Sequence, residues 1–277
     1  AVSTVGPSAS AVTYYLGNGS VTVDQDKDGN GAYSYQGEDG PRTYVNVEKA
    51  ETGDGTIYVM DGKAPTEVPP TTDNSDNGTE VPTPTDNDTQ STDASADNTE
   101  NSSTSETTTT NTITVKEDVT GATIVVDRVN VDTTSTPTEV SADAKEDKKT
   151  IIKVGEGADV DLTVKDSKLT TGGHGIDIGV NLEGEDKNKE TNVDLTLDNT
   201  KINLTENATA GINARDNSDV DITLKGDNTI DGSEAIDKVT EGGGHDISKD
   251  NVNIEGIRVG GEGASDSSDA SEGANTK

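Results

Sequence analysis

The sequence predicts an all-β fold, namely a right-handed parallel β-helix (solenoid) preceded by a small β unit and a disordered acidic linker. Three similar strand sequences recur after residue 150, each followed by a turn and a further short strand. Their apolar and polar residues alternate with a period of two, which is the period of a strand. The 277 residues include six Tyr but no Phe and no Trp, so a large core must be aliphatic. Stacked coils with aliphatic interiors satisfy all three observations.

Composition excludes several classes of function. The chain carries 21 Lys plus Arg against 54 Asp plus Glu, a formal net charge of −33, and it has no Cys. Such a charge repels nucleic-acid phosphates and anionic lipid, so we expect no nucleic-acid partner and regard cations as the natural partners. The lack of Cys excludes disulfides and cysteine-based metal or catalytic sites. No apolar run approaches the roughly 18 residues that span a bilayer, so we expect no membrane insertion.

Residues 1–63 are predicted to form the small β unit. Between residues 11 and 62, short alternating strands are separated by Gly-Asn-Gly and Asp-Gly turns. All six Tyr fall in this segment. We therefore expect the aromatic packing of the protein here, with an exposed sugar-stacking platform as the alternative.

Residues 64–112 are predicted to be a disordered linker rich in Thr, Asp, Ser and Pro. Within residues 69–112 the hydrophobic set is represented only by Val81, Ala94 and Ala96. This leaves too little apolar area to offset about 1–2 kcal/mol of backbone entropy per residue. The Thr-rich stretches would suit O-glycosylation, and a bare acidic spacer is the alternative.

Residues 113–264 are predicted to form the β-helix. The repeats VDLTV, VDLTL and VDITL begin at Val160, Val193 and Val220. Each is followed by a turn and a second strand and is preceded by a third strand type, so the order of strand types recurs as in a solenoid. A β-sandwich is the rival fold, and it would instead show hairpin turns about every 8–12 residues.

The repeat breaks off near the end of the sequence. Gly256–Ser265 matches Ile151–Asp159, which leads directly into a VDLT strand, but here a polar tail over residues 265–277 follows. Either the tail caps the stack or the parent protein contains further coils. Free coil ends would also allow self-association, because unpaired strand edges pair with other chains.

The alternation that turns the valines of each repeat inward turns their polar neighbours outward. The predicted ligand-binding residues are the outward pairs of the three repeats, Asp161, Thr163, Asp194, Thr196, Asp221 and Thr223. Rungs of a parallel sheet lie about 4.8 Å apart, so stacked carboxylates repel unless a cation or a hydrogen-bonded ligand intervenes. These ladders favour a calcium or sugar-hydroxyl face, with a solvated charged face as the alternative. A regular Thr ladder alone would suit ice or mineral, which the adjacent Asp ladder disfavours for ice.

A second candidate is a calcium loop. Asp24, Asp26, Asp28 and Asn30 form the pattern DxDxDGN, whose alternating oxygen ligands and central Gly suit a loop around a hard cation. Tyr35 stands where an EF-hand would need its bidentate Glu, and the flanks are strand-like. We therefore expect a calcium site on a β-hairpin, with a plain Asp/Gly turn as the alternative.

No catalytic constellation is evident. His174 and His245 lie in Gly-rich stretches without close partners that would make them metal ligands. Arg258 aligns with Lys153, Asp177 and Asn213 of other coils. An Arg beside calcium would suit proton abstraction, but no motif fixes that geometry. Carboxylates are so abundant that a pair of them is not diagnostic. We expect a protein that is not an enzyme.

The repeats carry a family resemblance. VDLTLDNTKINLT at Val193–Thr205, AGINA at Ala210–Ala214 and SDVDITLKGDNTIDG at Ser218–Gly232 resemble the carbohydrate-binding β-helix proteins of clostridial and related Gram-positive cell surfaces. The resemblance covers residues 111–264. It implies a pectate-lyase-like fold, a secreted or cell-surface location, and non-catalytic binding of acidic polysaccharide or cell-wall glycan together with Ca²⁺. The alternative is a structural or adhesive surface protein that self-assembles into fibres or a sheath.

Overall fold

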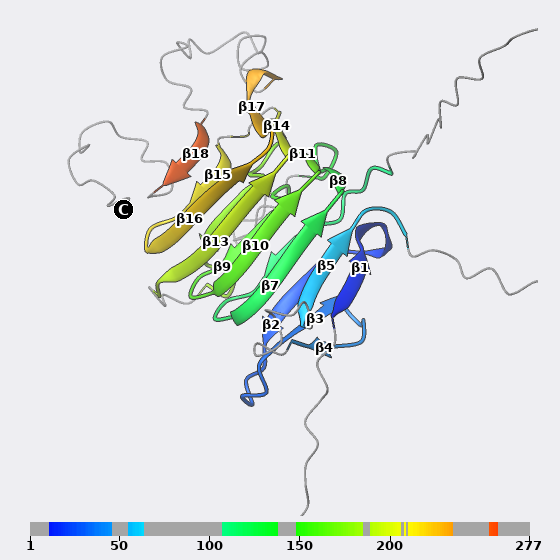
Figure 1. The fold of residues 1–277 in the computed structure, drawn as a ribbon, viewed down its shortest axis with the longest axis vertical. Helices are drawn as coiled ribbons and strands as arrows, with labels where there is room; N and C mark the ends of the chain where they lie inside the picture. The colour runs from blue at the N-terminus through cyan, green and yellow to red at the C-terminus, as the bar shows by residue number, and fades with distance from the viewer. Residues whose placement is uncertain are drawn as a thin grey trace, which may run out of the picture. The chain divides into compact units, whose positions relative to one another are not determined.

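The computed structural model describes residues 11–45, 55–63, 107–137, 148–184, 189–205, 208, 210–234 and 255–259. These residues form an all-β fold of three sheets, in which nearly all strands run parallel (Figure 1). The polar tail and most of the predicted linker lie outside the described residues. Residues 107–112 are described and belong to the fold, because Thr109 bridges Val131 and the Asn111 side-chain amide donates to the Leu16 carbonyl. The part of the chain that is described contains no helix long and apolar enough to cross a membrane.

The three sheets are here named A, B and C. Sheet A contains β1 (Val12–Tyr15), β5 (Thr56–Met60), β7 (Thr120–Asp127), β10 (Asp159–Lys165), β13 (Thr191–Asp198) and β16 (Ser218–Lys225). Sheet C contains β8 (Asn130–Asp132), β11 (Lys168–Thr171), β14 (Lys201–Leu204) and β17 (Thr229–Asp231). Sheet B contains β2 (Val21–Gln25), β3 (Ala32–Gln36), β4 (Thr43–Tyr44), β6 (Ile113–Val115), β9 (Ile152–Gly155), β12 (Ile176–Val180), β15 (Ala210–Ala214) and β18 (Glu255–Val259). A 3-10 turn, η1 (Leu16–Asn18), joins β1 to β2.

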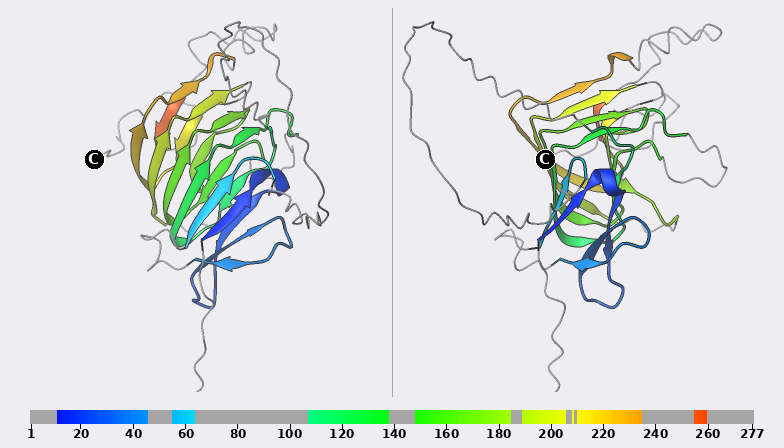
Figure 2. Two further views of the ribbon diagram at one scale, coloured as in Figure 1. Left: turned by 45° about the vertical axis from the view of Figure 1, so that its right-hand side comes forward. Right: turned by 90° about the vertical axis from the view of Figure 1, so that its right-hand side faces the viewer.

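From β7 onward the chain visits sheets A, C and B in the same order four times, and each visit adds one parallel strand to each sheet (Figure 2). One A–C–B round is called a coil below. The VDLT strands pair in the predicted register, with Val160 opposite Val193 and Val193 opposite Val220. The order of three strand types therefore reflects a solenoid-like fold, whereas a sandwich would require antiparallel hairpins throughout.

The N-terminal strands belong to the same sheets. Strand β5 pairs with β7, placing Ile57 beside Ile124, and β2 pairs with β6, placing Val21 beside Ile113. The expected boundary between a β unit at residues 1–63 and a β-helix at 113–264 does not separate two folding units. Aliphatic inner residues on β2 and β5 continue the stack, so they extend it instead of forming a core of their own. Among the strands that the structure describes, only the β2–β3 and β3–β4 pairs are antiparallel.

The core is an aliphatic stack, as the composition predicts. Leu162 and Leu195 pair in register and are 0% and 1% exposed, and Ile124 beside them is 0% exposed. The inner positions of sheets B and C are filled in the same way by Val, Ile, Leu and Ala. Each inner side chain thus contacts its equivalents above and below, and this contact fixes the register of the strands.

Asparagines at the corner between sheets A and C tie neighbouring coils together. The Asn199 side-chain oxygen accepts from the Asp227 backbone N–H at 3.0 Å, and that of Asn228 accepts from the Thr200 N–H at 2.9 Å. Asn199 also adopts a φ of 48°, a left-handed conformation that Asn tolerates better than most residues. Asn199 therefore both adopts the backbone conformation of the turn and forms a hydrogen bond to the next coil.

The packing of the aliphatic stack predicts how much a large-to-small substitution in it lowers the free energy of unfolding. Leu195→Ala should lower the free energy of unfolding by about 2–4 kcal/mol, because the removed groups are fully packed between two coils. Thr196→Ala, on the outer face of the same strand, should change it by no more than about 0.5 kcal/mol. Urea unfolding followed by circular dichroism measures both values. Equal losses for the two variants would contradict the assigned facing of β13.

Candidate functional site

The outer face of sheet A carries four polar rows that run along the solenoid. Two are called the carboxylate rows, Asp159–Asn192–Asp219 and Asp161–Asp194–Asp221. The third is the threonine row, Thr163–Thr196–Thr223, and the fourth is the alternating row, Asp127–Lys165–Asp198–Lys225. The structure therefore brings all six predicted ligand-binding residues together, in the register that the repeats predict.

Charge is distributed unevenly over these rows. In the alternating row each carboxylate stands next to a lysine, and the Lys165 Nζ lies 3.5 Å from the Asp127 Oδ2. The carboxylate rows contain no lysine. Partial burial, followed by the charge and hydrogen bonding of Asp194 and the charge of Asp159, raises the pKa of Asp161. The neighbouring acids thus oppose the ionisation of Asp161.

The carboxylate rows line a shallow depression of about 140 Å³. Its walls are Asp159, Asn192, Val193, Asp194, Asp219 and Asp221. Carboxylate and amide oxygens are the donors that Ca²⁺ prefers, so the donor set suits this ion. Within the described residues, no three acidic or His side chains converge closely enough to hold a metal by themselves. An ion on this face would need further oxygen ligands from a bound molecule or from water.

The DxDxDGN residues lie in the hairpin formed by β2 and β3, with Asp24 on β2 itself. The Asp26 carboxylate accepts from the Asp28 backbone N–H at 2.9 Å, the Asn30 side-chain amide at 2.7 Å and the Tyr44 hydroxyl at 3.1 Å. The first two bonds are the main reason that the pKa of Asp26 is lowered. The Asp24 carboxylate instead accepts from the Tyr33 hydroxyl at 3.1 Å. The loop brings Asp26 and Asn30 together and directs Asp24 elsewhere, which is the arrangement of a hydrogen-bonded turn.

Three tyrosines of this region, Tyr33, Tyr35 and Tyr44, pack together beside Arg42. The rings of Tyr33 and Tyr44 have centroids 5.5 Å apart, and the Arg42 guanidinium lies 5.0 Å from the centroid of the Tyr33 ring. The Tyr14 hydroxyl forms a buried hydrogen bond with Ser34 at 2.9 Å. These contacts fix the hairpin against the first strands of the stack.

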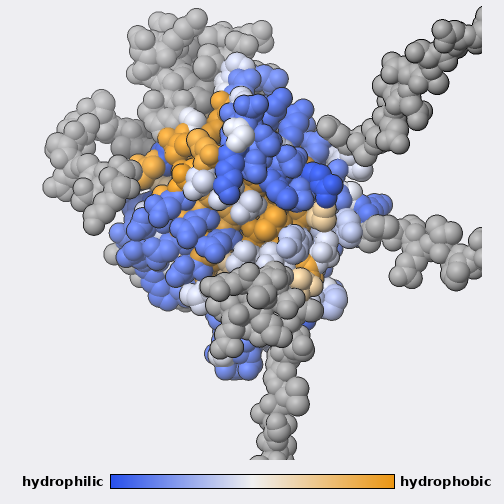
Figure 3. Space-filling view, viewed as in Figure 1, coloured by the Kyte–Doolittle hydropathy of each residue, from blue (hydrophilic) through white to orange (hydrophobic). Residues whose placement is uncertain are grey.

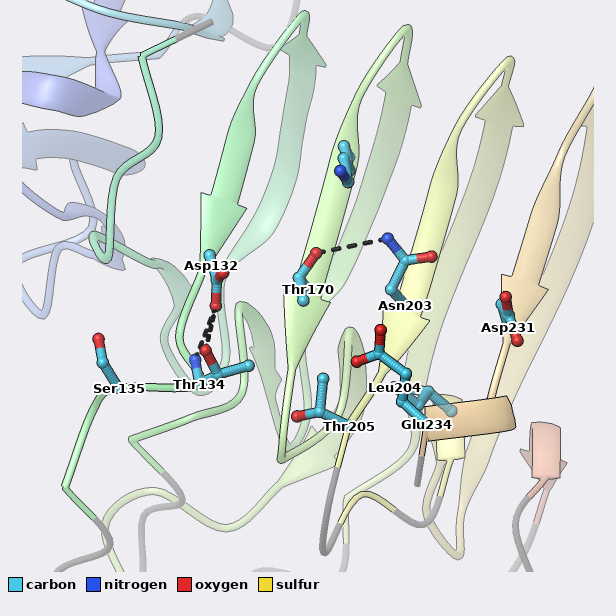
Figure 4. Close-up of a pocket in the computed structure, with 10 residues that line it drawn as sticks. Asp132, Thr134, Ser135, Thr170, Asn203, Leu204, Thr205, Asp231 and Glu234 are labelled. Carbon is cyan, nitrogen blue, oxygen red and sulfur yellow. Dashed lines mark hydrogen bonds between the residues drawn. The ribbon is translucent and has the colours of Figure 1, made fainter. Parts of the chain in front are cut away.

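Sheet C carries a polar groove that the sequence analysis did not identify. Asp132, Thr170, Asn203 and Asp231 lie in one row across its four strands (Figure 4). They line a groove of about 610 Å³ with Thr134, Ser135, Lys168, Leu204, Thr205 and Glu234. The Asn203 amide donates to the Thr170 hydroxyl at 3.4 Å. The groove thus offers hydroxyl, amide, carboxylate and ammonium groups on one surface. In the sequence, the sign of this groove was the recurring position of the second strand of each coil. The polar residue at that position differs in type from coil to coil.

The outer face of sheet B holds a buried ion pair. The Arg215 guanidinium donates to both oxygens of Asp177, at 3.1 and 2.9 Å, and the Asn213 amide donates to the same carboxylate at 2.9 Å. Asp177 and Asn213 are 2% and 3% exposed. Arg258 lies in register with Asn213, as the alignment predicts. Because the Asp177 carboxylate is already held by two partners, this cluster stabilises the coil and has the geometry of a structural pair.

Comparisons with protein-family models, with curated proteins and with solved structures find no match to this chain.

The crowded carboxylates predict a pH-dependent stability. A carboxyl whose pKa is raised by folding destabilises the folded state when ionised, and this penalty disappears as the pH falls through the raised pKa. Asp161→Asn should therefore raise the melting temperature at pH 7. The gain in the free energy of unfolding should be less than about 1 kcal/mol, because the side chain is largely hydrated. The gain should shrink as the pH is lowered toward 3.8, the ordinary pKa of this group.

The matched control is Asp198→Asn, in the alternating row between two lysines. This change should give no gain at pH 7, because it removes an attractive charge. Thermal melts at several pH values measure both variants. A gain for Asp161→Asn that is independent of pH would contradict the electrostatic cause.

Proposed function

We propose that this protein is an extracellular, cell-surface, non-catalytic module that binds acidic polysaccharide with the help of Ca²⁺. The observation that carries the proposal is the contrast between the rows of sheet A. Lysine neutralises the alternating row, whereas the carboxylate rows keep five Asp side chains without any lysine. Nothing in the requirements of folding favours this arrangement, because stacked like charges destabilise a sheet. A surface that attracts cations accounts for it.

The parallel strands also support a right-handed winding of the coils. A connection between parallel strands of one sheet is right-handed in about 98% of cases, because of the twist of the strands. We therefore propose a right-handed parallel β-helix, as expected from the repeats.

Calcium would be held jointly by protein and ligand. Bound Ca²⁺ would link carboxylates of the protein to carboxylates of the polysaccharide, whose negative charge would otherwise be repelled by a chain of net charge −33. The charge of Asp194 already opposes the ionisation of Asp161, so these two residues are the natural pair on the protein side. The threonine row beside them supplies hydroxyl groups that can hydrogen-bond to sugar hydroxyls.

A soluble oligogalacturonate tests this proposal. Calorimetry should detect binding in millimolar Ca²⁺ and none after chelation. The double variant Asp161→Asn/Asp194→Asn should bind at least about tenfold more weakly, because charged ligands of the ion are lost. Asp198→Asn should bind as the unaltered protein does. Binding that survives chelation, or that ignores the double variant, would contradict calcium bridging on these rows.

A second candidate function is favoured by the groove on sheet C. Its mixture of hydroxyl, amide and ammonium groups can bind an uncharged glycan directly, without a cation. None of the described residues that line the groove is aromatic, so hydrogen bonds would provide the affinity.

Uncharged cellohexaose and maltohexaose test the groove. If either binds there, Asn203→Ala should weaken binding about fivefold, the worth of roughly one hydrogen bond, irrespective of Ca²⁺. Lys201→Ala is the matched control, because Lys201 lies on the same strand and does not line the groove. Equal effects of the two substitutions would exclude the groove as the binding surface.

A further inference from the structure

The coil formed by β16, β17 and β18 exposes apolar side chains at one end of the solenoid. Of the large hydrophobic residues that the structure describes, three are exposed: Leu224 at 60%, Ile257 at 43% and Val259 at 44%. All three are in register with buried residues of the preceding coil, so they face the stack. Figure 3 shows apolar residues reaching the surface on this side, where β15, β16 and β18 lie in Figure 1.

The opposite end of the solenoid is closed. Leu16 in η1 is fully buried and Tyr14 is 8% exposed, so the first coil does not present an apolar end. In sheet B, the antiparallel strands β3 and β4 follow β2 and occupy its outer edge. A head-to-tail stack of copies would place an apolar end against a closed one. Between copies of this chain, the apolar end is therefore matched by its own equivalent and not by the opposite end.

We propose that two copies of this chain associate through this end, with β16 of one copy pairing antiparallel with β16 of the other about a two-fold axis at Ile222. In this register Ile222 lies opposite its own equivalent, and Val220 lies opposite Leu224. Asp219 of each copy then lies opposite Lys225 of the other. The sequence SDVDITLK of β16 is thus self-complementary in both its apolar and its charged positions.

The neighbouring registers match less well. Centring the axis on Asp221 places this carboxylate against its own equivalent, and like charges directly opposite each other destabilise a strand pair. Centring it on Thr223 leaves Val220 opposite Gly226. Only the axis at Ile222 pairs all three inward residues of β16 with one another.

The other two sheets fit the same axis. A two-fold axis through sheet A exchanges sheets B and C, so β17 of one copy meets β18 of the other. The inward residues on these strands are Ile230 on β17 and Ile257 and Val259 on β18. Apolar side chains therefore face one another in all three sheets, which is the arrangement that removes apolar area from water.

Sedimentation velocity on the full chain over a wide range of concentration tests the proposal. We expect a reversible equilibrium between monomer and dimer. Lys225→Asp should weaken the dimer by about tenfold or more, because two attractive pairs become repulsive. The exchange variant Asp219→Lys/Lys225→Asp should restore it, since the pairs are then reversed on both copies. Lys201→Asp on β14 makes the same charge change away from the edge and should have no effect.

Three outcomes would overturn the proposal. A monomer at all concentrations would mean that another segment of the chain covers the end. Growth beyond the dimer would mean head-to-tail or fibre assembly. A dimer that responds to neither single nor exchange variant would use a different surface or register. Circular dichroism melts of each variant establish that the fold is retained.

Discussion

The register between parallel strands is the constraint on which every other feature of this protein depends. Each inner Val, Ile or Leu packs on its equivalent one coil away, as Leu162 packs on Leu195. A slip by one residue would turn the aliphatic side chains outward and the Asp and Thr side chains into the core. The same register that buries the core therefore aligns the outer rows. A core without Phe or Trp is sufficient because identical aliphatic side chains stack at a constant spacing.

The repeats made the stacked part of the fold predictable. Period-two alternation gives the facing of each residue, and the recurrence of VDLT gives the register, so the outer rows of sheet A followed directly. The joining of residues 1–63 to the same sheets did not follow, because β2 and β5 have no VDLT signature and are separated from their partners by a long polar segment. Pairing across such a distance depends on apolar complementarity that no local pattern reveals. The groove on sheet C was missed for a related reason: its row contains Asp, Thr, Asn and Asp in turn, so it is not a sequence repeat.

The carboxylates on the outer faces of the three sheets are compensated in different ways. Sheet B buries Asp177 and supplies Arg215 and Asn213 as partners. The alternating row of sheet A places lysines between carboxylates, and the ends of the groove use carboxylates to accept backbone N–H groups, as Asp231 does from Ser233 at 2.9 Å. The carboxylate rows use none of these devices. The alternating row contains lysine and the carboxylate rows do not, although they are neighbours on one sheet. The overall acidity of the chain therefore does not explain the difference between them.

The pairing of β5 with β7 has a consequence for the connectivity of the molecule. The segment between residues 64 and 106 leaves from the end of one strand and returns to the neighbouring rung of the same stack, so topologically it is an insertion within a single fold. A backbone break anywhere in that segment would leave two fragments whose strands still share two sheets. The fragments would be held together by non-covalent contacts alone, and the termini created by the break would be natural points for circular permutation.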